Sequence, residues 1–129
     1  MTDWIDRCRE IFERADRAAS ELSTRVGLGC PPGCGACCNS PDVETTVAEM
    51  RPLARRIVEE GRTEEVVARI DRATEAGERR CVSYVADPFD PRIGRCGVYA
   101  DRPLVCRLFG FAASRDKHGR DVFRSCGVL

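Results

Sequence analysis

The chain has 129 residues, and its 21 basic and 21 acidic side chains give a formal net charge of zero at pH 7. Such a balance argues against nucleic acid or an anionic membrane as a partner. No apolar run approaches the roughly 18 residues needed to cross a bilayer. Acidic residues such as Asp3 and Glu10 interrupt the N-terminal stretch, unlike a signal peptide. We therefore expect one cytoplasmic domain, residues 1–129, with no membrane contact.

The first 26 residues have the pattern of an amphipathic helix. Apolar residues recur there at steps of three and four, namely Trp4, Ile5, Cys8, Ile11, Phe12, Ala15, Ala19 and Leu22. This period predicts a helix over about residues 3 to 25 that ends near Gly27 and Gly29. Cys8 falls on the apolar stripe, so we expect it to be a small packing residue rather than a ligand.

The other eight of the nine cysteines are candidate metal ligands, and four of them fall within nine residues. They are Cys30, Cys34, Cys37, Cys38, Cys81, Cys96, Cys106 and Cys126. Thiolates are soft ligands that favour zinc, copper(I) and iron–sulfur clusters, and the C-x-x-C spacing lets two sulfurs reach one metal. Disulfides rarely persist in the cytosol. An exported, disulfide-linked domain is the alternative, which an odd count and two adjacent cysteines fit poorly.

Two more helices are expected between the cysteine loop and the next lone cysteine. Thr46 and Glu49 have capping-box spacing and open the first of these helices. Pro52 lies too deep for a first turn, so it predicts a kink or a second helix start. The second helix begins near Thr63 and stops at Gly77.

The C-terminal third is expected to be irregular. Residues 81–85 and 96–99 read as short extended pieces, and Asp101 is placed to cap a helical turn that carries Cys106. His118, the only histidine, lies in a polar turn, which leaves no Ser-His-Asp arrangement. The predicted fold class is mainly α: a small single domain of three to four helices with a short-stranded, cysteine-rich region organised by metal.

Two segments together carry a family resemblance. They are Cys34-Gly35-Ala36-Cys37-Cys38 and Cys96-Gly97-Val98-Tyr99-Ala100-Asp101-Arg102-Pro103-Leu104-Val105-Cys106-Arg107. With Thr46, Glu49, Cys81 and Cys126-Gly127, they resemble the YkgJ-type cysteine-cluster (CxxCxxCC) family, described as zinc- or iron-chelating domains. The resemblance covers about residues 30–127. Two details depart from the family pattern: the first gap, 31–33, is three residues long, and no proline separates Cys126 from Gly127.

The resemblance implies a chelated zinc or an iron–sulfur centre. Some members of the family are described as iron–sulfur oxidoreductases, and related domains occur in flagellin lysine methylases. Four thiolates around zinc or a [4Fe–4S]²⁺ cluster leave two net negative charges. Nearby arginines could offset this charge and donate hydrogen bonds to sulfur. They are Arg92, Arg95, Arg102 and Arg107, and we single out Arg107 as cofactor-binding because it is adjacent to Cys106.

Three functions follow from these residues. The first is a metal-binding protein that holds an iron–sulfur cluster, [4Fe-4S], or zinc; eight thiolates with no histidine ligand favour the cluster. The second is an iron–sulfur oxidoreductase or electron-transfer protein with a protein redox partner, or a methylase-associated enzyme. The third is a purely structural zinc module or a metal chelator. No catalytic group is expected beyond the centre itself.

Overall fold

The computed structural model describes residues 3–27, 29, 34–40, 43–90, 93–108 and 112–124, so Cys30 and Cys126 lie outside the described residues. Its α-helices are α1 (Trp4–Val26), α2 (Val47–Glu59), α3 (Thr63–Glu75) and α4 (Leu104–Arg107). Two short 3₁₀ turns, η1 (Ala36–Asn39) and η2 (Tyr99–Asp101), accompany them. The strands are β1 (Tyr84–Ala86), β2 (Gly94–Cys96), β3 (Ala112–Arg115) and β4 (Asp121–Arg124). The mainly α fold class is confirmed.

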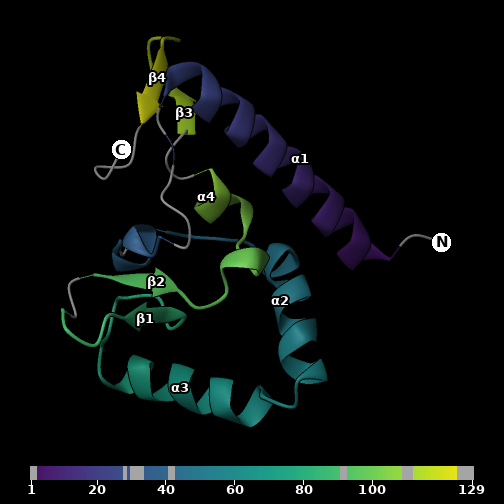
Figure 1. Cartoon of the computed structure of the whole chain (residues 1–129), viewed down its shortest axis with the longest axis vertical. Coiled ribbons are helices and arrows are strands. Elements are labelled where there is room, and N and C mark those ends of the chain that lie inside the picture. The colour runs from purple at the N-terminus through teal and green to yellow at the C-terminus, as the bar shows by residue number, and fades with distance from the viewer. Residues whose placement is uncertain are drawn as a thin grey trace.

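The three long helices follow one another in an open arc, with α4, β1 and β2 on its inner side and the hairpin β3–β4 at the tip where α1 ends (Figure 1). Helix α1 packs against α2 and α4, and α2 packs against α3. The cysteine turn η1 contacts β2. Among the described helices, none combines the length and apolar character that crossing a bilayer requires. The arc thus presents its concave side to the cysteine-bearing segments.

Helix α1 ends where the sequence predicts. Gly27 has a φ of 69°, and its amide donates to the Ser23 carbonyl at 2.9 Å. A left-handed residue costs glycine little, so Gly27 can close the helix and let the chain turn away. Cys8 and Phe12 are the buried residues of α1 and face α2 and α4. Cys8 is therefore a packing residue, as its place on the apolar stripe predicts.

Cys8 also supplies a hydrogen bond that α2 needs. Helix α2 runs without a second start through Pro52, which is fully buried and has no N–H to donate. In an α-helix the missing donor would have served the carbonyl four residues earlier, that of Ala48. The Cys8 thiol donates to the Ala48 carbonyl, with Sγ and O 3.7 Å apart. The thiol of α1 thus compensates for the proline of α2.

We expect Cys8→Ala to destabilise the protein by about 1 to 2 kcal/mol, because it removes buried volume and leaves the Ala48 carbonyl without its donor. Pro52→Ala restores an N–H within α2, so the loss from Cys8→Ala should be smaller in the Pro52→Ala background. Urea unfolding of the two single variants and the double variant measures this coupling. Additive losses would show that the thiol does not serve this carbonyl, and metal content should stay unchanged throughout.

The capping box at the start of α2 also connects this helix to α4. The Thr46 hydroxyl accepts from the Glu49 amide, and Glu49 Oε2 accepts from the Thr46 amide. Glu49 Oε1 also accepts from the amide of Leu104, the first residue of α4, at 3.1 Å. The Thr46 hydroxyl also donates to Glu49 Oε2 at 2.7 Å, and this bond has the largest effect in lowering the pKa of the Glu49 carboxyl. One carboxylate therefore fixes the start of α4, and with it Cys106, against α2.

The prediction that Asp101 caps the turn carrying Cys106 is wrong. Asp101 ends η2, and its carboxylate pairs with Arg56 of α2. The position before α4 is Pro103, which has no side-chain hydrogen bond to the helix. The free amide at the start of α4 is served instead by Glu49, from a segment 55 residues away. Such a long-range cap leaves no local sequence signal.

The two hairpins lie in the C-terminal third. In the first, β1 and β2 pair antiparallel and Tyr84 faces Cys96; in the second, β3 and β4 pair around a turn at residues 116–119. His118 is exposed in that turn, as predicted. Among the described residues, three of the five buried hydrophobic side chains are cysteines: Cys8, Cys38 and Cys96. The apolar core around the hairpin β1–β2 is therefore small.

Candidate metal centre

The turn that carries Cys37 and Cys38 is held against β2 by its backbone. Cys34 forms an isolated antiparallel bridge with Arg95. Gly35 is buried, and a Cβ built there would lie 2.8 Å from the Arg95 carbonyl carbon and 2.9 Å from its Cα. Only glycine allows this approach. The turn η1 follows Gly35 directly and carries Cys37 and Cys38.

Gly35→Ala should therefore displace η1 from β2. The φ of −105° is accessible to alanine, so the cost comes from the overlap with the Arg95 backbone and should be about 1 to 3 kcal/mol. Metal bound per chain should fall as well, because Cys37 and Cys38 move. Gly27→Ala is the control: it is strained by its positive φ but has no atom within 4 Å, so it should cost stability without loss of metal. Urea unfolding and elemental analysis compare the two; equal metal content would contradict the prediction.

Among the described residues, five thiols line one cavity of about 220 Å³. They come from η1, from the segment before β1, from the end of β2 and from α4, and they are Cys37, Cys38, Cys81, Cys96 and Cys106. The rest of the wall includes Met50, Leu53, Arg79, Ser83 and Arg102. Segments far apart in the sequence thus bring their sulfurs to a common space, to whose wall helix α2 contributes Met50 and Leu53.

Cys38 is the centre of this group. Its thiol is within hydrogen-bonding reach of Cys37, Cys81 and Cys96, and its backbone carbonyl accepts from the Cys81 amide at 2.9 Å. The bond to Cys37 has the largest effect in raising the pKa of Cys38. Conversely, Cys38 lowers the pKa of Cys81 to about 6 and that of Cys96 to about 7. Two sulfurs beside Cys38 are therefore poised to be thiolates near neutral pH.

The thiol of Cys106 extends the group at the other end. Its hydrogen bond to Cys37 lowers the pKa of Cys37 well below the ordinary thiol range, and Cys38 and Arg102 act in the same direction. The same bond, with burial, raises the pKa of Cys106. A metal takes thiolate rather than thiol, so ligation must displace the protons of Cys38 and Cys106. Metal affinity should therefore fall as the pH is lowered.

Arg102 is one of two arginines on the described cavity wall, with Arg79. Its side chain stacks on the Tyr99 ring, with the guanidinium carbon 3.5 Å from the ring centroid, and donates to the carbonyls of Tyr99 and Cys106. Arg102 is 8% exposed, so its charge acts with little screening by solvent. It lowers the pKa of Cys37 and Cys96. Arg102 can thus offset the negative charge of thiolates, one of the roles considered for the arginines of this region.

Arg107 makes its described contacts away from the cavity. Its guanidinium donates to the carbonyls of Arg102 and Ala100 at 2.6 Å and to the Asp16 carboxylate at 2.5 Å. The guanidinium carbon lies 4.5 Å from the centroid of the Phe12 ring. Arg107 therefore joins α1 to the segment that carries Cys106. The prediction that it binds a cofactor stays a prediction.

Of the remaining predicted ligands, Cys34 lies within the described residues. Cys34 is half-buried and is absent from the described cavity wall; its sulfur accepts from the Ala36 amide at 3.4 Å. Within the described residues, no three His, Cys, Asp or Glu side chains are already arranged to hold an ion. The five thiols line the cavity as a hydrogen-bonded series instead. Sequence reasoning missed Arg79 on the wall, for which its place two residues before Cys81 was the available signal.

Comparison with known proteins identifies the family. The model of the CxxCxxCC family, whose description reads "Putative zinc- or iron-chelating domain", matches residues 29–127. No curated protein and no solved structure gave a significant match. The matched region includes every cysteine of the cavity and the capping box that positions Cys106. The chain therefore belongs to the CxxCxxCC family of metal-chelating domains.

Proposed function

We propose that the protein holds an iron–sulfur cluster through thiolates of the cavity. The observation that carries this proposal is the gathering of five thiols from four separate segments around one space of about 220 Å³. The donor set fits a cluster, because the described lining residues include five cysteines and no histidine. Sulfur donors suit iron–sulfur clusters and zinc, and disfavour magnesium or calcium. Cys37, Cys38, Cys81, Cys96 and Cys106 are the residues that would hold the group.

The number of sulfurs and the size of the cavity favour a cluster over a single zinc ion. A structural zinc site takes four ligands and closes around the ion. Here five thiols of the described residues line part of a space far larger than the roughly 10–15 Å³ of probe volume that one water occupies. An inorganic cluster fills more of such a space than one ion. When bound, it supplies electron-transfer chemistry at a potential set by its surroundings.

The chain's own residues would tune that centre. Arg102, held by the carbonyls of Tyr99 and Cys106, places a buried positive charge beside the thiolates. Hydrogen bonds and positive charge near cluster sulfurs raise a reduction potential. The centre would also have a structural role. The apolar core around β1 and β2 is small, and metal ligation can contribute roughly 10–16 kcal/mol to folding.

Anaerobic purification followed by analysis of iron, zinc and acid-labile sulfide tests the proposal. We expect iron and sulfide together, with broad visible absorption that dithionite bleaches. Zinc without sulfide would overturn the cluster and retain a thiolate metal centre. If the freshly purified protein held neither iron nor zinc, and still held neither after reconstitution with iron and sulfide, metal binding at these thiols would be overturned.

A further inference from the structure

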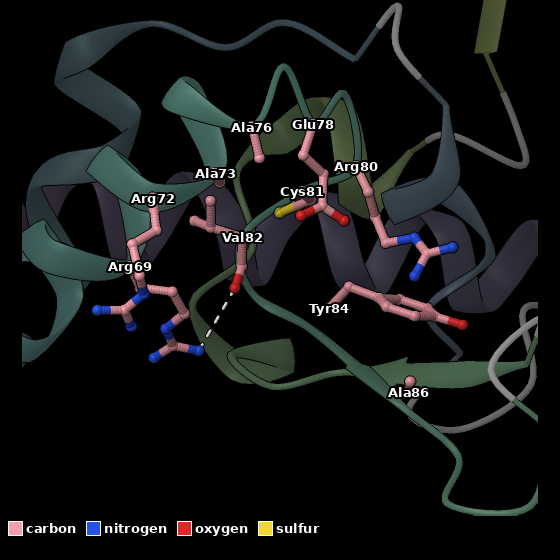
Figure 2. A pocket seen from close by; sticks show the side chains of 10 residues that line it. All are labelled: Arg69, Arg72, Ala73, Ala76, Glu78, Arg80, Cys81, Val82, Tyr84 and Ala86. Atoms are coloured by element: carbon pink, nitrogen blue, oxygen red, sulfur yellow. Dashed lines mark hydrogen bonds between the residues drawn. The ribbon is translucent and has the colours of Figure 1, made fainter.

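A second cavity lies next to the thiols. It is a groove of about 420 Å³ between α3 and the segment that leads into β1. Ten residues line it: Arg69, Arg72, Ala73, Ala76, Glu78, Arg80, Cys81, Val82, Tyr84 and Ala86 (Figure 2). Three are arginines and one is acidic, so the groove carries net positive charge in a molecule with a formal net charge of zero.

The arginines keep hydrogen-bonding capacity for a ligand. The Arg72 guanidinium makes no hydrogen bond or ion pair with any described residue, and Arg80 stacks on the Tyr84 ring with its guanidinium carbon 4.5 Å from the centroid. Arg69 is partly engaged, by Glu65 at 3.0 Å and by the Val82 carbonyl at 3.4 Å. Guanidinium groups bind carboxylate and phosphate through paired N–H donors. The groove therefore suits an anion with several oxygens.

Cys81 connects the two cavities. It lines both the groove and the thiol cavity, and it is exposed, whereas Cys38 and Cys96 are buried. In Figure 2 its sulfur lies between Arg69 and Arg72 on one side and Arg80 and Tyr84 on the other. A molecule bound by these arginines is thus placed beside Cys81, the exposed cysteine of the described thiol cavity.

We propose that the groove docks an anionic metal chelate with carboxylate or phosphate oxygens, and that Cys81 is the first sulfur to take the metal from it. This inference rests on the proposed function. In the exchange, a metal–oxygen bond of the chelate breaks as the bond from the metal to Cys81 Sγ forms. The oxygen leaves as the carboxylate or phosphate anion, any thiol proton passes to solvent, and no electron is transferred. The metal can then pass inward to the sulfur of Cys38.

The test uses charge reversal at one arginine of the groove. Arg72→Glu is compared with Arg51→Glu, a matched control, since Arg51 is an exposed helical arginine of α2 whose guanidinium bonds to none of the described residues. Binding of metal-free citrate and pyrophosphate is measured by calorimetry. Zinc loading is then timed from zinc–citrate, zinc–pyrophosphate and zinc chloride, with bound zinc read by elemental analysis. Citrate and pyrophosphate distinguish a carboxylate carrier from a phosphate carrier.

We expect Arg72→Glu to weaken anion binding about tenfold and to slow loading from the preferred chelate by a similar factor. Loading from zinc chloride should not slow, because a cation gains from the lost positive charge, and Arg51→Glu should behave as the unmodified protein. Equal weakening in both variants, or slowing from zinc chloride too, would overturn the docking site. A protein that binds the free anions but takes zinc from no source would overturn the transfer step, whereas the analysis of iron and sulfide decides the proposed function separately.

Discussion

Replacing Cys38 by alanine should lower the metal bound per chain at least about tenfold in competition with a chelator. Cys38 is buried and contacts three other sulfurs of the cavity, Cys37, Cys81 and Cys96, so no other thiol there can substitute for its position. Loss of an outer-shell partner alone costs 10- to 100-fold in metal affinity, and loss of a ligand should cost more. Anaerobic preparation and elemental analysis give the readout.

Two other cysteines serve as controls for that variant. Cys8→Ala should keep its metal, because Cys8 lies on α1 and bonds the Ala48 carbonyl. Cys34→Ala tests whether Cys34 is a ligand, because this member of the C-x-x-C pair is absent from the described cavity wall. If Cys8→Ala lost metal and Cys38→Ala kept it, the division of the cysteines into ligands and a packing residue would be wrong.

Truncating Arg107 should destabilise the protein by about 3 kcal/mol. The side chain is 6% exposed, and its removal leaves the carbonyls of Ala100 and Arg102 without these donors and Phe12 without its cation–π partner. Urea unfolding of Arg107→Ala measures the loss. Arg107→Lys should recover only part of it, because an ammonium cannot reproduce the guanidinium fork.

Asp16→Asn separates the ion pair from the backbone contacts. The Asp16 side chain is 48% exposed, so this pair is screened by solvent and its loss should cost less than about 1 kcal/mol. Metal content of Arg107→Ala also tests the prediction that Arg107 binds the cofactor. A variant of normal stability that lost its metal would support that prediction and contradict the structural role.

The family pattern on its own identified the chemistry of this protein. Soft sulfur donors, C-x-x-C spacing and the segment around Arg102-Pro103 are local features, and they pointed to the family that matches residues 29–127. The helices could also be predicted from the sequence, because the period of apolar residues and the Thr46–Glu49 capping box depend only on nearby residues. The period placed Cys8 on the buried side of α1 for the same reason.

Tertiary structure decided which thiols meet. Cys37, Cys38, Cys81, Cys96 and Cys106 line one cavity because Gly35 lets η1 touch β2 and because Glu49 holds α4 against α2. Both are contacts between segments far apart in the chain, and sequence spacing does not encode which partner a carboxylate or a glycine will find. Adjacency to Cys106 predicts that Arg107 binds the cofactor, yet its described donors point to Asp16 and two carbonyls. Two adjacent residues share a helix, but their side chains point in different directions. Here the packing of α1 against α4 directs the Arg107 side chain toward α1.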